Sequence, residues 1–254
     1  WDEDKGLPQV ATRKLAPVER YGLRVTLFAA AIVLVAIPFG LLLQQVASDG
    51  PFTTFDLEVA AWLNRQVSPR GWAVDVAQVV SFLGKPIFLI FAVGVPGLWI
   101  AWRREWRLVI FLAVTCLGGG LVSTAVKLAV GRGRPVVDNP IATAFGQSFP
   151  SGHAMASLVC YGALLLVFLP LAPRHRRHAL VGVAVAVVAA IGVTRLALGL
   201  HFTTDVVAGY VLGAAWLVAS VAAFEIWRQD RGRRRTRPLE EGVEPEEIRD
   251  LVQG

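Results

Sequence analysis

Apolar residues in this chain gather into long runs instead of alternating with polar ones. Six runs approach or reach the roughly 20 residues with which an α-helix crosses a bilayer. They cover residues 25–43, 86–102, 108–126, 154–171, 179–197 and 206–226. Inside a membrane only helices and closed barrels satisfy their own backbone groups, and runs of this length favour helices. The pattern predicts an all-α integral membrane protein with six transmembrane helices in a bundle.

Three segments depart from this simple pattern. The second run is short and contains Pro96, so we expect it to begin earlier, near Phe82, and to kink. Residues 52–80 mix charges with apolar positions at helical spacing, which predicts one or two interfacial helices lying along the membrane surface. From Arg228 onward the chain is polar and charged, and we expect a mobile tail or a short exposed helix without chemistry.

Composition agrees with a membrane protein. Hydrophobic residues make up 55% of the chain and charged residues only 17%, whereas soluble domains are near a quarter charged. Cys116 and Cys160 both lie inside apolar runs, so we interpret them as small buried apolar side chains rather than as a disulfide or metal ligands. We therefore expect the lipid bilayer as a partner and no nucleic acid.

Basic residues are distributed unevenly between the two sides of the predicted bundle. Most of the 25 Lys and Arg residues fall before the first run, in the links after the second and fourth runs, and in the tail. Cytoplasmic segments are enriched in Lys and Arg, so both termini are predicted to be cytoplasmic. The chain then divides into a cytoplasmic segment 1–24, a six-span domain 25–227 and a charged cytoplasmic tail 228–254.

Three polar clusters fall on the opposite side of the predicted bundle. The first is KLAVGRGRP, with six residues between Lys127 and Arg134, and the second is PSGH, residues 150–153. The third, TRLALGLHFTTD, contains Arg195, His201 and Asp205. A lone arginine or histidine at the end of a span is usually an interfacial side chain. Ionisable groups that gather at membrane depth from three separate hairpins favour a functional site instead.

The PSGH motif has the features of an anion site. Its proline cannot continue a preceding helix, and Ser151 is a favourable N-cap. The first amides of the following helix then lack partners, and Gly152 lets the backbone approach a ligand. Lys127, Arg134 and Arg195 add positive charge, which suits a phosphoryl group and its transition state.

The spacing of His201 and Asp205 indicates nucleophilic chemistry. Residues four apart on a helix share one face and lie within contact. A carboxylate bonded to one ring nitrogen fixes the tautomer and leaves the other nitrogen free to attack, so we expect His201 to be the nucleophile. His153 would then protonate the leaving oxygen. Arg132 and Asp138 remain open between structural and substrate-contacting roles.

Other polar and small residues favour structural interpretations. His175 and His178 lie in the basic link PRHRRH, where a cytoplasmic or lipid-facing position explains them. Gly209 and Gly213 are four residues apart in the last run, a spacing that predicts close packing between helices.

Together the three clusters resemble the signature of the type 2 phosphatidic acid phosphatase superfamily, K-x6-RP, PSGH and SR-x5-H-x3-D. That superfamily also includes glucose-6-phosphatase and the vanadium-dependent haloperoxidases. This sequence matches the first two motifs in full and differs once in the third, where Thr194 replaces the common serine and keeps a hydroxyl. The motifs run from Lys127 to Asp205, and the six-span layout extends the resemblance over about 25–226.

The resemblance implies phosphoester hydrolysis without a metal or other cofactor, through a phosphohistidine on His201. Asp205 would assist His201, and His153 would protonate the leaving group. The phosphate would be held by Lys127, Arg134, Ser151, Gly152 and Arg195.

Membrane members of the family act on lipid phosphates. The resemblance therefore implies a lipid phosphate substrate, of polyprenyl pyrophosphate, phosphatidylglycerophosphate or phosphatidic acid type, in the bacterial plasma membrane. We expect the site to face the periplasm or cell exterior. The alternatives are a lipid-phosphate transporter and a protein that binds lipid headgroups without hydrolysis. Haloperoxidase chemistry is disfavoured because those relatives are soluble.

Overall fold

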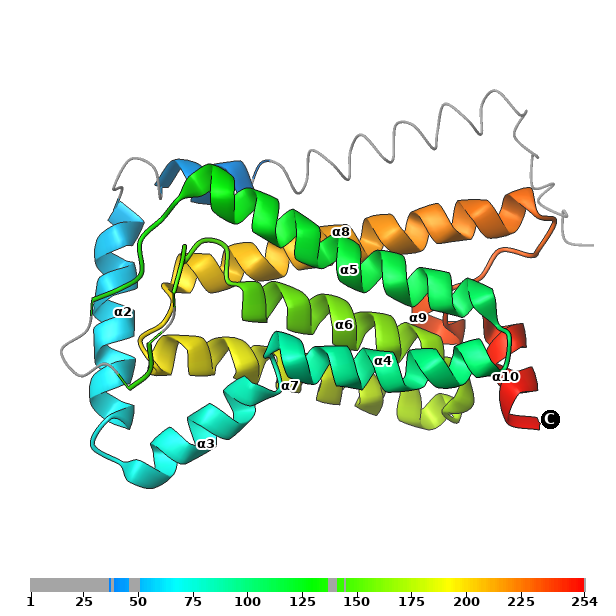
Figure 1. The fold of residues 1–254 in the computed structure, drawn as a ribbon, viewed down its shortest axis with the longest axis horizontal. Coiled ribbons are helices and arrows are strands. Elements are labelled where there is room, and N and C mark those ends of the chain that lie inside the picture. Colours follow the sequence, from blue (N-terminus) through cyan, green and yellow to red (C-terminus); the bar gives the residue numbers. More distant parts are fainter. Residues whose placement is uncertain (1–36, 38, 46–50, 137–140, 144, 254) are drawn as a thin grey trace, which may run out of the picture.

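A computed structural model describes residues 37, 39–45, 51–136, 141–143 and 145–253 of the chain. Within these ranges the regular structure is entirely helical, which confirms the all-α prediction (Figure 1). The predicted first span, 25–43, lies largely outside the described residues, and so does the predicted segment 1–24. Residues 37 and 39–45, at the end of that span, are helical.

Five long helices form a bundle whose members run along the long axis of the molecule (Figure 1). They are α4 (Pro86–Trp102), α5 (Trp106–Val130), α6 (Gly152–Phe168), α7 (Arg174–Ala197) and α8 (Thr203–Asp230), and a short 3₁₀ turn, η1 (Leu169–Leu171), extends α6. Each of the last five predicted apolar runs therefore corresponds to one helix, because burial in lipid or protein selects the same long apolar segments.

Shorter helices close the two ends of the bundle. At one end α2 (Pro51–Val67) lies across the bundle axis, and α3 (Gly71–Phe82) leads obliquely from it to α4 (Figure 1). Their ranges match the segment predicted to form one or two interfacial helices. At the other end lie α9 (Pro238–Glu241) and α10 (Pro245–Gln253).

Helix α6 lies at the centre of the bundle and packs against α4, α5, α7 and α8. Glycines make the approach of α8 possible: a Cβ on Gly209 would lie 2.7 Å from the Ser151 carbonyl oxygen, and one on Gly213 would lie 3.2 Å from the Met155 carbonyl oxygen. The predicted packing role of these glycines is confirmed. Their contact holds the start of α8 directly against the start of α6.

Four helical segments are long and apolar enough to cross a membrane, namely α5, α6 with η1, α7 and α8. Helix α4 has only 17 residues, but α3 and α4 form a fifth candidate if the pair, bent by 46°, is one broken span. The bend lies before Pro86, which begins α4, and Pro96 lies inside that helix. The described residues thus give four or five candidate spans, and the predicted six are not confirmed.

The last part of the charged tail, residues 242–248, is packed against the bundle, so the expectation of a mobile or exposed segment is wrong there, whereas most side chains of residues 231–240 are exposed. Val243, Ile248 and Leu251 join a buried core with Leu166 and Phe224. Apolar positions spaced along α10 supply this packing face.

The charges of the tail are neutralised by ion pairs. The Arg228 guanidinium is completely buried, bonds to the buried carboxylate of Glu244 and donates to the Val243 carbonyl oxygen at 3.0 Å. Arg233 reaches the same carboxylate at 2.8 Å. Exposure of the tail was predicted because composition does not show that its arginines and glutamates form buried ion pairs.

Candidate active site

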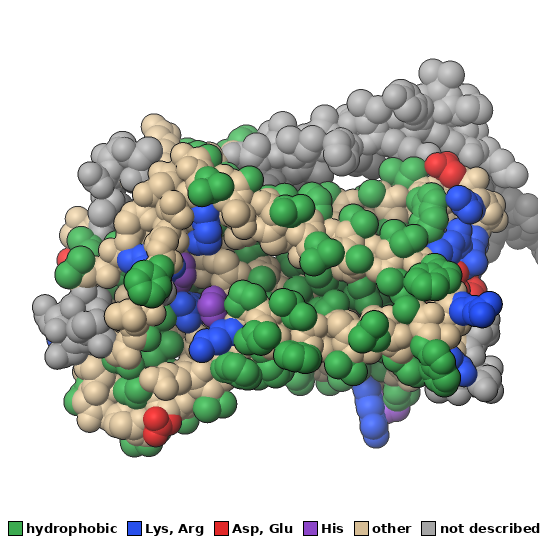
Figure 2. Space-filling view, in the orientation of Figure 1, with side chains coloured by type: hydrophobic (Ala, Val, Ile, Leu, Met, Phe, Trp, Pro, Cys, Tyr) green, Lys and Arg blue, Asp and Glu red, His purple; other side chains and the backbone are tan. Residues whose placement is uncertain are grey.

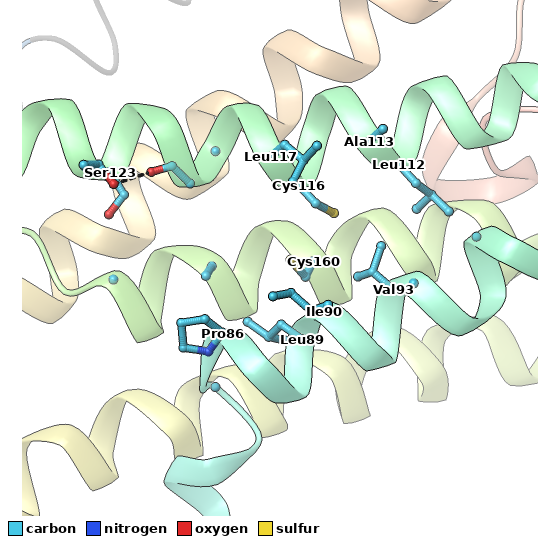
Figure 3. Close-up of a pocket in the computed structure, with 18 of the residues that line it drawn as sticks. Pro86, Leu89, Ile90, Val93, Leu112, Ala113, Cys116, Leu117, Ser123 and Cys160 are labelled. Atoms are coloured by element: carbon cyan, nitrogen blue, oxygen red, sulfur yellow. Dashed lines mark hydrogen bonds between the residues drawn. The ribbon is translucent and has the colours of Figure 1, made fainter.

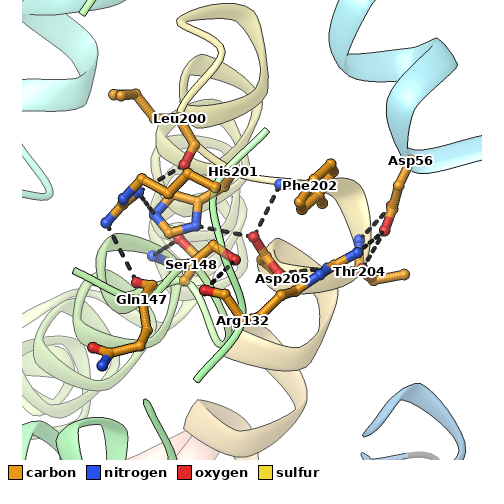
Figure 4. Close-up of polar contacts among 12 residues, drawn as sticks. Asp56, Arg132, Gln147, Ser148, Leu200, His201, Phe202, Thr204 and Asp205 are labelled. Atoms are coloured by element: carbon orange, nitrogen blue, oxygen red, sulfur yellow. Dashed lines mark hydrogen bonds and ion pairs between the residues drawn. The ribbon is translucent and has the colours of Figure 1, made fainter. Parts of the chain in front are cut away.

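The predicted site residues converge at the end of the bundle beside α2. Lys127 is in the last turn of α5 and Arg195 in the last turn of α7, whereas Ser151 caps α6 and Asp205 is in the first turn of α8. His201 lies in the short link between α7 and α8 (Figure 4). Because α5 and α7 end where α6 and α8 begin, the antiparallel arrangement brings the three motifs together.

The start of α6 has the predicted capped form. Ser151 Oγ accepts a hydrogen bond from the Ala154 amide at 3.5 Å, and the Ser151 amide donates to the Asp205 carbonyl oxygen at 2.8 Å. The amides of Gly152 and His153 occupy the first two helical positions, where no intrahelical carbonyl can accept their hydrogen bonds. A Cβ on Gly152 would lie 3.6 Å from Lys127 Cε, so the lysine lies close to this helix start.

His201 is held by the carboxylate of Asp205. The distance from His201 Nδ1 to Asp205 Oδ2 is 3.2 Å, and the Phe202 amide donates to the same oxygen at 3.0 Å. With Nδ1 donating its proton to Asp205, His201 Nε2 is the unprotonated ring nitrogen and carries the lone pair. Arg134 Nη1 lies 3.3 Å from that Nε2.

Burial controls the charge of His201, whose side chain is only 2% exposed. Burial lowers the pKa of His201 to about 4, Asp205 opposes the shift, and the positive charges of Arg195 and Arg134 add to it. The balance between carboxylate and arginines, which the sequence left open, thus gives a neutral ring at pH 7. A neutral imidazole is the form that can act as a nucleophile.

Lys127 and Arg134 are bonded to the loop that precedes α6. Lys127 Nζ donates to the Gln147 carbonyl oxygen at 3.0 Å. Arg134 Nη1 donates to the Leu200 carbonyl oxygen at 2.7 Å, and its Nε donates to that of Gly146 at 3.2 Å. Burial lowers the pKa of Arg134, and the charge of Asp205 opposes that shift. Carbonyl groups therefore hold both cations next to His201.

Two buried nitrogens at the site have no hydrogen-bond partner among the described residues. They are His153 Nε2 and Arg195 Nε. Arg195 is positioned by Nη1, which donates to Ser81 Oγ at 2.7 Å. Arg195 and His201 are among the groups whose charge acts on His153, so the three side chains lie near one another. Buried polar atoms are nearly always paired, so these two nitrogens indicate a place for a ligand.

A groove of about 610 Å³ leads away from the site along the bundle (Figure 3). Lys127 and His153 line one end, and the groove continues between α4 and α5 to Val93 and Leu112. Figure 2 shows Lys, Arg and His side chains gathered at the α2 end of the bundle and hydrophobic side chains along the flank beside them. A charged site therefore adjoins an apolar channel.

The two cysteines are free and both line this groove, Cys160 buried and Cys116 partly buried. Their interpretation as small apolar side chains agrees with this position.

Three groups near the site come from residues that the sequence analysis did not select. Asp56 of α2 and Thr204 of α8 take part in a buried hydrogen-bond network, and Ser81 of α3 holds Arg195. No signal in the sequence singles out Asp56, because Glu58 is a second carboxylate two residues later in α2. Arg132, left open by the sequence, bonds to Asp205, whereas Asp138 lies outside the described residues.

The composition of the site suits an anion. Cationic side chains and helix-start amides outnumber the single carboxylate that faces His201. Over the part of the chain that the structure describes, no three His, Cys, Asp or Glu side chains are grouped as metal ligands.

Comparison with known families identifies the fold that carries this site. The family model described as PAP2 superfamily matches residues 107–229, which include all three motifs. Residues 107–229, a little under half of the chain, are therefore similar to the PAP2 superfamily. The resemblance drawn from the motifs is thereby confirmed.

Curated relatives within the PAP2 superfamily are lipid phosphatases by name. Phosphatidylglycerophosphatase B of Bacillus subtilis is 29% identical over 146 residues, which cover 56% of this chain and 70% of that protein. A lipid A 1-phosphatase of Rhizobium etli is 28% identical over 154 residues, covering 56% of this chain and 60% of that protein. These relatives support a membrane phosphatase of the PAP2 type.

Two solved PAP2-type structures share the fold. A transmembrane phosphatidylglycerolphosphate phosphatase from Bacillus subtilis aligns with a TM-score of 0.68 at 22% identity, covering 81% of this chain and 98% of that one. Aquifex aeolicus LpxE aligns with a TM-score of 0.53 at 17% identity, covering 66% of this chain and 95% of that one. At these identities the likeness concerns the fold.

Proposed function

We propose that this chain is an integral-membrane lipid phosphate phosphatase that hydrolyses a phosphomonoester or pyrophosphate through a phosphohistidine on His201. One observation carries the proposal: a neutral His201 held by Asp205 lies near the buried, unpartnered ring nitrogen of His153. Cations from three elements surround the two rings. A tetrahedral phosphoryl group between the rings would satisfy the unpartnered nitrogens and the positive charge together.

In the first step, the lone pair of His201 Nε2 forms a bond to phosphorus, and the bond from phosphorus to the lipid oxygen breaks. Nδ1 keeps its proton on the hydrogen bond to Asp205, whose negative charge stabilises the ring as it becomes positive. His153 gives a proton to the departing oxygen. The negative charge of the bound phosphate favours the protonated form of His153 that this step needs.

In the second step, water attacks the phosphohistidine. The water gives a proton to His153, its oxygen bonds to phosphorus, and the phosphorus–nitrogen bond breaks to release inorganic phosphate. Lys127, Arg134, Arg195, the Ser151 hydroxyl and the Gly152 amide would stabilise the charge on the phosphoryl oxygens in both steps. No metal ion enters this scheme, and metal independence is part of the proposal.

The groove supports a lipid as the substrate. Between Lys127 and Leu112, helix α5 rises about 22 Å, enough to lie beside a long acyl or prenyl chain. The lining is mainly apolar, and the groove meets the charged site at His153. A polyprenyl pyrophosphate, a phosphatidylglycerophosphate or a phosphatidic acid fits this description, and the first two curated relatives are named for lipid phosphates.

We further propose that the site faces the extracytoplasmic side of a bacterial plasma membrane and that both termini are cytoplasmic. Arginines gather at the end of the bundle away from the site, in the link between α4 and α5 and at the starts of α5 and α7; these are Arg103, Arg104, Arg107, Arg174 and Arg176. The enrichment of basic residues on cytoplasmic surfaces supports this orientation.

Phosphate release from a panel of lipid monophosphates and pyrophosphates in detergent tests the proposed function. We expect activity that persists in EDTA, is inhibited by vanadate, and disappears in His201→Ala. Full activity in His201→Ala would refute the phosphohistidine. Transfer of lipid phosphate across liposomes without any phosphate release would instead show a transporter, and headgroup binding alone would show a non-hydrolytic binding protein.

A further inference from the structure

Asp56 on α2 is a fully buried carboxylate outside the three motifs and outside the matched range 107–229. Its Oδ1 accepts a hydrogen bond from the Thr204 amide at 2.9 Å. Its Oδ2 accepts one from Arg132 Nη2 at 3.1 Å and another from the Thr204 hydroxyl. The hydrogen-bond partners of Asp56 are thus Arg132 and Thr204, which lie next to Asp205 (Figure 4).

Arg132 connects Asp56 to the pair formed by His201 and Asp205. Its Nη1 donates to Asp205 Oδ1 at 2.7 Å and to Thr204 Oγ1 at 2.8 Å. Its guanidinium lies over the Phe202 ring, 4.0 Å from the centroid. Asp205 therefore uses one oxygen for Arg132 and the other for His201, so the orientation of the carboxylate toward the ring is fixed from both sides.

One guanidinium is shared by two buried carboxylates. If Arg132 were paired with Asp205 alone, its charge would offset the carboxylate that His201 needs when its ring becomes positive. A second carboxylate bonded to Arg132 gives the group of Asp56, Arg132 and Asp205 a net negative charge. Electrostatic interactions are strong in this buried setting, so that charge can stabilise the positive ring. A buried, unpaired carboxylate would be strongly unfavourable, so Asp56 and Arg132 also require each other.

We infer that Asp56, acting through Arg132 and Thr204, is a positioning residue that sets the orientation and effective negative charge of Asp205 behind the nucleophilic histidine. The inference rests on the proposed function. Asp56 bonds to none of the phosphate-binding candidates, so it should affect the chemical step and leave substrate binding unchanged. Helix α2 is thereby part of the catalytic apparatus as well as the cover of one end of the bundle.

The test compares Asp56→Asn with wild type on the best lipid phosphate found in the panel. We expect kcat to fall about 10–100-fold, the range found when partners that orient a functional group are removed. The KM and the inhibition constant for vanadate should stay within about twofold, because the cations around the phosphate are unchanged. A merely structural role would weaken vanadate binding and kcat together.

Two further variants separate charge from folding. Glu58→Gln removes an exposed carboxylate from the same helix and should leave kcat and KM unchanged. Thr204→Val keeps the shape and all charges but removes the hydroxyl that joins Asp56 to Arg132, and it should lower kcat by a smaller factor with KM unchanged. This variant also keeps the test decisive if Asp56→Asn does not fold.

A double-variant cycle tests the route through Arg132. If Asp56 offsets the charge of Arg132, then Asp56→Asn combined with Arg132→Gln should lose less activity than the product of the two single losses. Unchanged kcat in both Asp56→Asn and Thr204→Val would overturn the inference, as would losses that multiply in the double variant. Absence of phosphate release by the wild type would instead refute the proposed function.

Discussion

Burial determines the protonation state of His201. An exposed imidazole is half protonated near pH 6.5, whereas burial lowers the pKa of His201 to about 4 even though Asp205 acts in the opposite direction. The ring is therefore neutral throughout the physiological pH range. Thr194, the one departure from the family motifs, does not alter this arrangement, because its hydroxyl donates to the Ile191 carbonyl oxygen at 2.7 Å within α7.

The pH dependence of kcat/KM should report this low pKa. Protonation of His201 removes the nucleophile only as the pH falls through about 4, so the acid limb assigned to the enzyme should lie near pH 4 and not near 6.5. Titrating the substrate itself gives the pKa of its phosphate and separates this limb from ionisation of the substrate. In Asp205→Asn the limb should move to lower pH, because the carboxylate that raises the pKa is gone. An acid limb near 6.5 that does not coincide with the pKa of the substrate would contradict the buried, neutral His201.

Arg195→Lys should lower kcat/KM by about 10–100-fold, because a buried site loses the planar guanidinium that can bond two phosphate oxygens at once. The lysine keeps the charge but cannot bond to Ser81 and also present a second nitrogen to phosphate. Arg176→Lys, at an exposed position in the basic link, is the matched control and should behave like wild type. Equal kinetics for both variants would show that Arg195 supplies only charge.

At the scale of elements, the packing of α4, α5 and α6 around the groove matters most for binding the proposed substrate. Gly84, at the break before α4, lies against His153: a Cβ there would be 3.1 Å from His153 Cδ2. The break thus brings the start of α4 to the site, and the groove follows α4 from that point. Under the proposed function, neighbouring parts of the same helices would contact the headgroup and the hydrocarbon chain of the lipid.

Gly97→Leu should place a side chain in this groove without disturbing packing, because a Cβ at Gly97 meets no atom within 4 Å. We expect KM to rise about 10-fold for a long-chain lipid phosphate, which loses apolar contact, and to change little for a short-chain soluble analogue. Gly182→Leu, at an equally open position on α7, is the control. An equal rise of KM for the long-chain lipid phosphate and the short-chain analogue would mean that the groove does not hold the hydrocarbon chain.

Sequence alone predicted the features that depend on local composition and on motif spacing. Long apolar runs predicted α4 to α8, and motif spacing predicted which helix ends meet. The sequence predicted a kink in the second apolar run but did not place the 46° break before Pro86. It also did not predict two contacts between distant segments, the carboxylate of Asp56 behind Asp205 and the buried pair of Arg228 and Glu244. The sequence does not show whether a charged side chain is hydrated or paired with another side chain.

At the scale of the whole molecule, charge is concentrated at both ends of an apolar bundle. The site occupies one end, and the other is closed by the tail, where Arg228 bonds to the buried Glu244. Burial raises the pKa of Glu244, and the arginines Arg228, Arg233 and Arg107 oppose that shift. Under the proposed function, the two ends therefore have separate tasks, chemistry at one and stability at the other.

Arg228→Gln should test that separation. Removing one member of a buried pair costs about 3–5 kcal/mol, so we expect a clearly lower Tm in detergent. The kcat of the folded protein should stay near that of wild type, because the tail lies at the far end from His201. Arg235→Gln, an exposed substitution in the same tail, should change neither quantity. A large loss of kcat at unchanged Tm would show that the two ends are coupled.

The groove along α4 has an implication for how the two reaction products separate. It runs along the flank of the bundle, where Ile90, Leu98 and Leu117 are largely exposed, while the cationic cluster lies at the bundle end. Under the proposed function, the dephosphorylated lipid would diffuse sideways into the leaflet while inorganic phosphate departs into water. The lipid alcohol departs first and phosphate second, because water attacks from the side that the alcohol has left. Each product has its own exit, so accumulation of either one should inhibit turnover by a separate route.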